Sequence, residues 1–322
     1  MRGRVELDEI AKRIKQARRV VIFSHMRPDG DAVGSSLALA CALDKLGVEC
    51  EVCNESLMPS NLSFLKGLKR IKKSFNGEAD LFVALDSADE MRLGTLSDTF
   101  AFAKRKTDTI NVDHHVSNTG YAKYNYIRAC AANCMNVASL LDLLGVEIDK
   151  EMATYLLVGL LTDSGNFSHD DVDEECFLLA ARLVKAGADI RELTYNLFKK
   201  QSKARAALHA EAMSKMRYYL EDRFAVIVIP KASMEKFGAD VGMTEGFVDF
   251  PLNVETVEVA ASLMEVKKGQ YKVSLRSKLY ADVNGIAGTY GGGGHIRAAG
   301  CMLFGDIEEI LDKLRYTVSQ YL

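Results

Sequence analysis

The stretch RRVVIFSHMRPDGDAVGSSLALACALDKLG, residues 18–47, joins a strand-like run to a helix-like run through a polar turn. RRVVIFSH (18–25) contains a run of apolar residues, several of them β-branched, which is typical of a buried parallel strand. The run over 31–47 predicts a helix that stops at Gly47. Its apolar residues recur at helical spacing: Val33, Leu37, Ala40 and Leu43.

The same alternation continues through the first half of the chain. Strand-like runs follow at VECEVCN (48–54), ADLFVALDS (79–87) and DTINVDHH (108–115), and helices are expected over 134–145 and 149–165. Strands that alternate with helices indicate βαβ units, so we expect an α/β fold with a mostly parallel sheet flanked by helices. Ligands of such sheets bind beyond the carboxyl ends of the strands. His25, Asp86 and Asp113 fall there.

The pattern changes in the second half. From about residue 173 to 220 the chain is helical and polar, which predicts a connector. Strands are then expected over 223–230, 257–266 and 270–277, and helices over 281–290 and 307–322. We therefore expect three parts: an α/β domain over 1–190, a helical linker over 191–220 and a smaller α+β domain over 221–322.

Composition narrows the class of protein. The 322 residues are 48% apolar and 26% charged with a net charge of −3, as expected of a soluble two-domain protein without a non-specific nucleic-acid coat. A small anionic substrate stays compatible with this balance. The seven scattered cysteines and the lack of a secretory h-region favour a reducing cytoplasm. No apolar run reaches the roughly 18 residues of a membrane span.

Polar side chains cluster at the expected ends of these elements. His25 ends a strand, and Asp29 and Asp31 lie in the turn before a helix, which gives a mixed nitrogen and oxygen set suited to Mn²⁺. A capping Asp and a satisfied histidine are the alternative interpretation. Asp86 follows an apolar strand, and Asp163 follows an apolar helix whose negative end disfavours a carboxylate unless a cation offsets it. A common strand-end or loop Asp is the alternative for each.

The triplet Asp113, His114 and His115 crowds the end of another strand. Adjacent residues at a strand end point in different directions, so the three need not share one task. Several Asp- and His-rich clusters at one sheet edge fit a two-metal site, which needs a bridging carboxylate and further ligands on each side. Asp86, alone on its strand, is the natural bridge.

A glycine-rich stretch, GTYGGGGHIRAAG (288–300), lies near the C-terminus. Four consecutive glycines are expected to leave backbone N–H groups free to approach an anion. His295 and Arg297 are candidate phosphate partners, and Arg276 is a further cation suited to bidentate phosphate recognition. A flexible surface loop and solvated arginines are the alternatives.

Together these stretches resemble a known family. HMRPDGDAVGS (25–35), ALDSADEMRLG (84–94), NVDHHVSN (111–118) and LLTDSGNF (160–167) resemble, in order and spacing, the four motifs of the DHH phosphoesterases. Arg276–Ser277 and GGGGHIRAAG (291–300) resemble their DHHA1 substrate-binding domain. The resemblance thus implies a DHH catalytic domain over 1–190 and a DHHA1 domain over 221–322. The length is most similar to the stand-alone nanoRNase/pAp phosphatase group.

The resemblance implies an activity and its cofactor. Members of this group hydrolyse short oligoribonucleotides to mononucleotides and remove the 3′-phosphate of 3′-phosphoadenosine 5′-phosphate (pAp), with water activated by two Mn²⁺ ions. Mg²⁺ and Co²⁺ are substitutes to be considered. The expected partners are short single-stranded RNA, pAp and related small nucleotides, and no membrane. A homodimer is compatible with the sequence, which does not fix the oligomeric state.

The resemblance also assigns roles to residues. One ion is held by His25, Asp29 and Asp86, and the other by Asp31, Asp86, His114 and Asp163. The catalytic set is His115, Asp113 and Asp86, with His115 at the phosphate and Asp113 orienting a histidine. The substrate set is Arg276, Ser277, Gly293, Gly294 and His295. One departure is Asn133–Asn136, where the family often has Ser/Thr and Glu.

Other functions stay open on the sequence alone. Within enzymes they are a phosphodiesterase for linear pApA, a polyphosphate-chain hydrolase and, less favoured, an inorganic pyrophosphatase. A non-catalytic nucleotide-binding protein would tolerate losses among the ligand residues, which are all present. A sequence-specific nucleic-acid binder would need a basic stripe, which this chain lacks.

Overall fold

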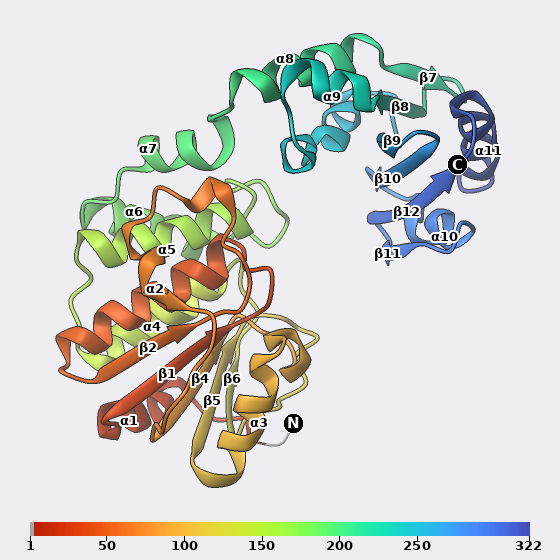
Figure 1. Cartoon of the computed structure of the whole chain (residues 1–322). Coiled ribbons are helices and arrows are strands. Elements are labelled where there is room, and N and C mark those ends of the chain that lie inside the picture. Colours follow the sequence, from red (N-terminus) through yellow and green to blue (C-terminus); the bar gives the residue numbers. More distant parts are fainter. Residues whose placement is uncertain (1–2) are drawn as a thin grey trace. The chain divides into compact units, whose positions relative to one another are not determined.

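The computed structural model describes residues 3–322, which fold as two compact units that meet in sequence at Lys200 and Gln201 (Figure 1). Each unit is built on its own six-stranded sheet. The predicted class, a parallel α/β part followed by helices and a smaller α+β part, is confirmed.

The first sheet has the strand order β3-β2-β1-β4-β5-β6, and all neighbouring strands in it are parallel. Its strands are β1 (Arg19–Ser24), β2 (Glu49–Cys53), β3 (Ile71–Lys72), β4 (Leu81–Leu85), β5 (Asp108–Asp113) and β6 (Tyr124–Ile127). The edge strands β3 and β6 were not predicted, because two and four residues are too short to show a clear pattern. The order reverses beside β1, between β1 and β4, where such sheets bind ligands.

Helices cover both faces of this sheet (Figure 1). Alternation along β1 sends Val20 and Ile22 into the larger core, against the helices on one face. Val21 and Phe23 face the other way, into a smaller core closed by α3 (Leu96–Lys106). The larger core is covered by α1 (Leu7–Gln16), α2 (Gly30–Lys45), α4 (Asn133–Leu144) and α5 (Lys150–Asp163).

Helices α2 and α5 approach each other through two glycines. A Cβ atom on Gly34 would lie 2.3 Å from the carbonyl oxygen of Tyr155, and one on Gly159 would lie 2.6 Å from Oδ1 of Asp31. A side chain on either glycine would force α2 and α5 to shift relative to each other. This contact holds the start of α2, with Asp31, against the last two turns of α5.

Three longer helical segments follow: α6 (Glu174–Lys185), α7 (Ile190–Thr194), which runs into a π-turn at Tyr195–Lys199, and α8 (Lys203–Ser214). Short 3₁₀ turns in the first unit are η1 (Ser60–Leu62), η2 (Lys66–Arg70) and η3 (Glu90–Leu93). The connector predicted to be helical up to residue 220 is wrong at its end, because Arg217–Tyr219 forms strand β7 of the second sheet. Its pairing with the apolar strand β8 overrides the helical pattern before it.

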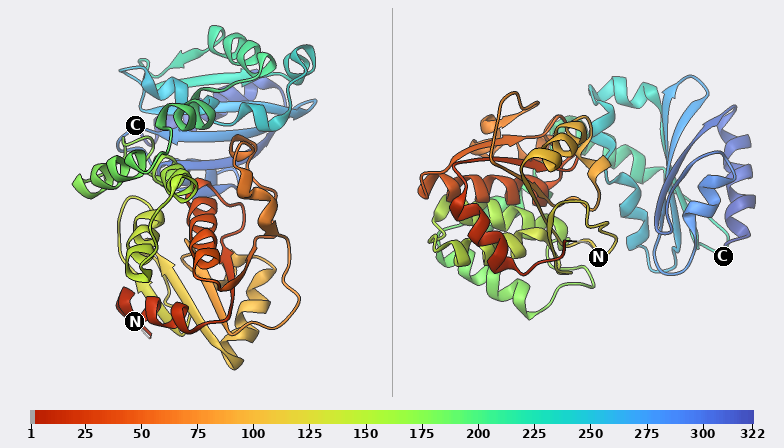
Figure 2. Two further views of the ribbon diagram at one scale, coloured as in Figure 1. Left: turned by 90° about the vertical axis from the view of Figure 1, so that its left-hand side faces the viewer. Right: turned by 90° about the horizontal axis from the view of Figure 1, so that it is seen from below.

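The second sheet has the order β11-β12-β10-β9-β8-β7, with β8 and β9 parallel and all other neighbours antiparallel. The remaining strands are β8 (Phe224–Ile229), β9 (Val259–Lys267), β10 (Gln270–Ser277), β11 (Gly293–His295) and β12 (Ala298–Phe304). Strands β11 and β12 and helix α9 (Lys231–Phe237) were not predicted. Helices α10 (Val283–Gly288) and α11 (Ile307–Ser319) cover one face, and α8, α9 and η6 (Phe247–Asn253) cover the other (Figure 2).

Among the described residues, no helix is both long and apolar enough to cross a membrane.

Candidate metal centre

The turn after β1 supplies a histidine and two carboxylates. Asp29 caps α2, since its Oδ1 accepts hydrogen bonds from the N–H groups of Asp31 and Ala32, both at 3.0 Å. Its second oxygen, Oδ2, faces Nε2 of His25 at 3.6 Å. On the sequence alone, Asp29 was either a helix cap or a metal ligand. In the structure, Oδ1 caps the helix, and Oδ2 faces His25.

Asp86 lies directly after β4, between two imidazoles. Its Oδ2 is 3.5 Å from Nε2 of His25, and its Oδ1 is 3.4 Å from Nε2 of His114. The residue adopts a positive φ of 53°, which costs free energy but which Asp tolerates better than most residues. Among the described residues, nothing donates a hydrogen bond to its buried Oδ1. While the ring of His114 is neutral, this carboxylate therefore lacks a donor at the atom that faces it.

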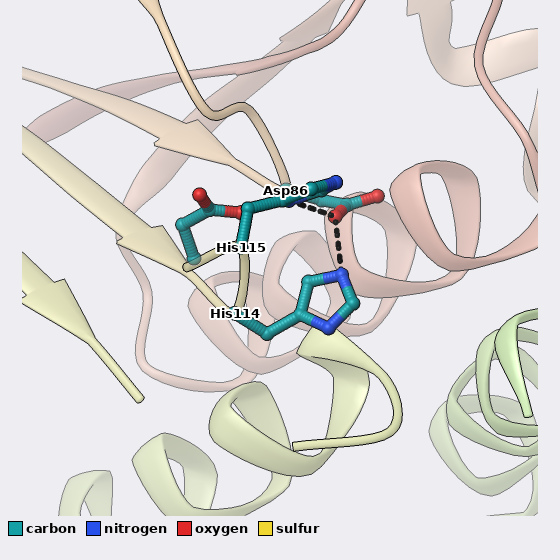
Figure 3. Close-up of side chains that lie close together, drawn as sticks. Asp86, His114 and His115 are labelled. Carbon is teal, nitrogen blue, oxygen red and sulfur yellow. Dashed lines mark hydrogen bonds and ion pairs between the residues drawn. The ribbon is translucent and has the colours of Figure 1, made fainter. Parts of the chain in front are cut away.

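The DHH triplet ends β5 and sends its side chains three ways. The ring of His114 is turned toward Asp86, and its Nε2 lies 3.3 Å from Oδ2 of Asp163 at the end of α5. His115 places its Nδ1 2.8 Å from Oδ1 of the fully buried Asp113 and 3.7 Å from Oδ1 of Asp86. Figure 3 shows both imidazoles directed toward the Asp86 carboxylate.

Backbone carbonyls set the orientation of two of these imidazoles. Nδ1 of His25 lies 3.0 Å from the carbonyl oxygen of Met26, and Nδ1 of His114 lies 2.8 Å from that of Cys130. A carbonyl can only accept, so each Nδ1 carries the proton and, in the neutral ring, Nε2 presents a lone pair. Both lone pairs face carboxylate oxygens, which are also acceptors. Only a proton or a metal cation between them makes this arrangement favourable.

The surrounding carboxylates raise the pKa values of the two histidines. Burial lowers the pKa of His25, but the hydrogen bonds and charges of Asp29 and Asp86 outweigh burial and raise it to about 10. Burial likewise opposes the charged form of His114, and Asp86 together with Asp31 raises its pKa to about 10. Without a metal, the site would hold cations in the form of protonated imidazoles.

Two of the carboxylates have pKa values above those of ordinary surface acids. Burial and the neighbouring charges of Asp86 and Asp29 raise the pKa of Asp163 to about 7. Burial, with Asp86 and Asp163 nearby, raises the pKa of Asp31 well above its usual range. The cluster therefore carries more negative potential than its own histidines neutralise. Divalent cations would replace these protons.

The ligand atoms gather into three overlapping groups, each within 4.8 Å: His25, Asp29 and Asp86; Asp31, His114 and Asp163; and Asp86, Asp113, His114 and His115. All six sequence-predicted metal ligands are present in them, and Asp86 lies next to both histidines that face the cluster. Imidazole nitrogen with carboxylate oxygen suits divalent ions such as Mn²⁺. The donor set and the hydrogen-bond-free Oδ1 of Asp86 therefore fit a centre for divalent metal ions.

The segment Asn133–Asn136, which differs from the family pattern, forms hydrogen bonds with two residues of the cluster. Asp31 accepts hydrogen bonds from the backbone N–H groups of Asn133 and Cys134, the latter at 2.9 Å, at the positive end of α4. Nδ2 of Asn136 lies 3.3 Å from the carbonyl oxygen of Asp113. Because backbone N–H groups hold Asp31, its position does not depend on the side chains that differ from the family pattern.

Two asparagines that the sequence interpretation missed hold other parts of the cluster. Nδ2 of Asn118 donates to Oδ2 of Asp113 at 2.5 Å and to Oδ1 of Asn111 at 2.8 Å. Nδ2 of Asn54 donates to the carbonyl oxygen of His25 at 2.9 Å. Asn118 is the last residue of the motif NVDHHVSN, and that position was the only available signal. Such partners orient the residues that contact ligands.

The sequence-predicted substrate residues lie in the second unit. Arg276 and Ser277 end β10, while Gly293, Gly294 and His295 form β11. Arg276 and His295 are both paired with Ala298 of β12, so they lie abreast across three strands. The fold thus brings the two parts of the substrate set to one end of the sheet. Nε of Arg276 is 3.3 Å from Oδ1 of Asp249.

The expectation that the four consecutive glycines leave their N–H groups free is wrong for three of them. The N–H groups of Gly291 and Gly292 donate to the carbonyls of Gly288 and Ala287 at the end of α10, at 3.0 Å each. That of Gly294 donates to Oδ1 of Asn284 at 2.8 Å. The glycines instead permit a close approach between strands, since a Cβ on Gly292 would lie 2.2 Å from the carbonyl oxygen of Gly300.

Comparisons with known proteins agree with this architecture. Residues 19–160 match the N-terminal domain of the DHH family, and residues 221–320 match the DHHA1 domain. The chain is 33% identical over 313 residues to a bifunctional oligoribonuclease and PAP phosphatase, NrnA, from Thermus thermophilus, covering 94% of this chain and 90% of that protein. The chain belongs to the DHH family. With its cluster of carboxylates and imidazoles, this DHH protein is a metal-dependent phosphoesterase.

Other proteins are similar over nearly the whole length of this chain. The Bacillus subtilis bifunctional oligoribonuclease and PAP phosphatase NrnA is 24% identical, with 92% of this chain and 93% of that protein covered. Among solved structures, an exopolyphosphatase-related protein from Bacteroides fragilis superposes with a TM-score of 0.87 at 28% identity, covering 98% of this chain and 96% of that one.

Proposed function

We propose that this DHH protein hydrolyses short oligoribonucleotides to mononucleotides and removes the 3′-phosphate of pAp. The observation that carries the proposal is the similarity, through both units, to an enzyme named for both activities. The cluster in the first unit supports the hydrolytic chemistry, and the cations and polar groups at one end of the second sheet support an anionic substrate.

Within the proposal, His25, Asp29 and Asp86 would hold one Mn²⁺, and Asp31, Asp86, His114 and Asp163 would hold another, with Mg²⁺ and Co²⁺ as substitutes to test. Divalent ions there would lower the pKa of bound water and offset phosphate charge.

The other residues of the proposed catalytic set act through hydrogen bonds. Asp113 accepts a hydrogen bond from Nδ1 of His115 and so orients the ring, and His115 contacts the scissile phosphate through Nε2. Arg276, Ser277, Gly293, Gly294 and His295 hold the far phosphate and nucleotide.

Hydrolysis of a ribodinucleotide and of pAp with Mn²⁺ tests the proposal. We expect both to be cleaved, and we expect Asp86→Ala to abolish cleavage because it removes the carboxylate that faces both imidazoles. Asp98→Ala is the matched control, since Asp98 is an exposed carboxylate in the first turn of α3. A wild type that cleaves neither substrate, or an Asp86→Ala variant as active as wild type, would refute the proposal.

A polyphosphate-chain hydrolase is the second candidate, favoured by the similarity to the exopolyphosphatase-related protein from Bacteroides fragilis. Initial rates on ribodinucleotide, pAp, linear pApA and polyphosphate, measured at one enzyme and Mn²⁺ concentration, rank the candidates. A dominant rate on polyphosphate would replace the nucleotide proposal, and a dominant rate on pApA would narrow it to a dinucleotide phosphodiesterase.

A further inference from the structure

A buried carboxylate shapes the loop between β10 and α10. Glu258 is 4% exposed, and its Oε1 accepts hydrogen bonds from the consecutive N–H groups of Leu279, Tyr280 and Ala281 at 3.0, 2.7 and 2.9 Å. No lysine, arginine or histidine in the described chain forms an ion pair with it. A buried charge is costly unless hydrogen bonds satisfy it, so Glu258 and the loop hold each other in one conformation.

Two cationic side chains fix the ends of the same loop. Nη1 of Arg297 donates to the carbonyl oxygen of Ala281 at 3.0 Å and lies 3.5 Å from Oγ of Ser277. Nζ of Lys278 donates to the carbonyl oxygen of Val254 at 2.7 Å. The main chain from 277 to 281 is thus tied at its start, middle and end, and its conformation is fixed before any ligand binds.

This rigid loop exposes two large apolar side chains at its apex. Leu279 is 69% exposed and Tyr280 is 54% exposed, and the Tyr280 ring packs against no other aromatic ring of the described chain. Exposed apolar side chains on a loop held this firmly favour a contact with a ligand. The loop begins directly after Arg276 and Ser277, the residues proposed to hold substrate phosphate.

We infer that Leu279 and Tyr280 form a stacking platform for the nucleobase of the substrate, with Glu258 as the positioning residue that holds the platform. The inference rests on the proposed function, because it takes its ligand to be a nucleotide. A face of every base can stack on a tyrosine ring, so a platform binds nucleotides without selecting a sequence. That is the recognition a hydrolase of short RNA requires.

Binding of two ligands that differ only in the base tests the platform. The ligands are 2′-deoxyadenosine 5′-phosphate and 1′,2′-dideoxyribose 5′-phosphate, titrated calorimetrically into the full chain with Mn²⁺. We expect wild type to bind the base-containing ligand more tightly by about tenfold or more, and Tyr280→Ala to lose most of that advantage while binding the abasic ligand as before. Tyr316→Ala, which removes a 71% exposed tyrosine on α11, is the matched control and should change neither affinity.

Kinetics on pAp give a second readout. Tyr280→Ala should raise KM by roughly tenfold with little change in kcat, and Tyr280→Phe should retain the wild-type values because the ring still stacks. Equal affinities of wild type for the two ligands, or an equal loss of both in Tyr280→Ala, would overturn the platform. A wild type that hydrolyses neither pAp nor the ribodinucleotide would instead refute the proposed function, and the binding comparison would still decide the platform.

Substitutions at Glu258 test its positioning role separately. Glu258→Leu removes the acceptor of three N–H groups, whereas Glu258→Gln keeps one oxygen in the position of Oε1. We expect the leucine variant to lose the preference for the base-containing ligand and the glutamine variant to retain it. A folded Glu258→Leu protein with the full preference would overturn the positioning role, and if this variant does not fold, the Tyr280 variants decide the inference.

Discussion

At the scale of single residues, the DHH triplet shows how one tripeptide meets three different surroundings. Asp113 is fully buried and holds His115, whereas His114 is turned by the Cys130 carbonyl so that its Nε2 faces Asp86. The two histidines are neighbours in sequence, and their rings lie 4.5 Å apart. Only His114 belongs to a group with Asp31 and Asp163.

Alanine substitutions should therefore separate the two histidines. His114→Ala removes a nitrogen that faces Asp86 and Asp163, so we expect loss of Mn²⁺ binding and of activity. His115→Ala leaves the groups His25–Asp29–Asp86 and Asp31–His114–Asp163 intact, so Mn²⁺ binding should persist while kcat falls by roughly a hundredfold or more. Calorimetric Mn²⁺ titration beside steady-state rates measures both. Equal loss of Mn²⁺ binding in the two variants would show that this division is wrong.

The residues that bear charge could be predicted from sequence, and their hydrogen-bond partners could not. His25, Asp86 and Asp163 stand at the ends of apolar runs, where a polar residue is conspicuous. Asn118 and Asn54 carry no such signal, because they are ordinary loop residues until the sheet brings them to Asp113 and His25. Their contribution depends on contacts between distant segments, which no local pattern encodes.

At the scale of elements, the contact between α2 and α5 places Asp31 beside Asp163. We expect Gly34→Ala to destabilise the protein by about 1–3 kcal/mol, because the added methyl group would lie 2.3 Å from the Tyr155 carbonyl oxygen and must push the helices apart. Thermal unfolding of the variant measures the loss. Gly288→Ala, whose added methyl would meet nothing within 4 Å, is the control and should leave the unfolding temperature close to that of wild type.

Gly34→Ala should also weaken Mn²⁺ binding more than Gly288→Ala does. Asp31 lies one helical turn from Gly34, and its Oδ1 would be 2.6 Å from a Cβ atom on Gly159 of α5, so a shift of α2 against α5 would move this carboxylate. Unchanged stability and Mn²⁺ affinity in Gly34→Ala would mean that the helices tolerate a wider separation.

Elements with a long apolar pattern could be predicted, and short or glycine-rich ones could not. Strands β1, β4 and β5 and helices α2 and α5 appear in the sequence as continuous runs. Strand β11 is Gly293–His295, and its pairing with β12 depends on the missing side chain of Gly294, where a Cβ would lie 2.4 Å from the carbonyl oxygen of Ala298, rather than on apolar residues. Glycine permits both a free anion-binding loop and a close strand pair. The sequence alone could not distinguish the two, and the predicted loop was the wrong choice.

At the scale of the whole molecule, the two units have separate hydrophobic cores. Among residues 3–322, the carboxylate and imidazole clusters all lie in the first unit, so metal ions should stabilise the chain mainly through that unit. A cation that binds the folded state at a hundred times its Kd adds about 2.7 kcal/mol to the free energy of unfolding. For a unit of this size, that raises the unfolding temperature by roughly 5–10 °C.

The pH dependence of that stabilisation has a definite sign. Without metal, the raised pKa values of His25 and His114, about 10, and of Asp163, about 7, mean that these groups stabilise the fold when protonated. The Asp163 contribution is complete below its ordinary pKa and is lost as pH rises to about 7, and the histidine contributions are lost from about pH 6.5 upward. The metal-free protein should thus unfold at a lower temperature near pH 8 than near pH 6.

Added Mn²⁺ should reverse this trend, because metal binding requires the deprotonated carboxylates and imidazoles. We expect the rise in unfolding temperature on adding Mn²⁺ to be larger near pH 8 than near pH 6, and chelation with EDTA to restore the metal-free value. Scanning fluorimetry at both pH values measures this, with Asp86→Asn expected to lose the Mn²⁺ effect and the exposed Asp98→Asn to keep it. A Mn²⁺ effect that is equal at both pH values, or larger near pH 6, would show that these protons and the metal ions do not compete for the same atoms.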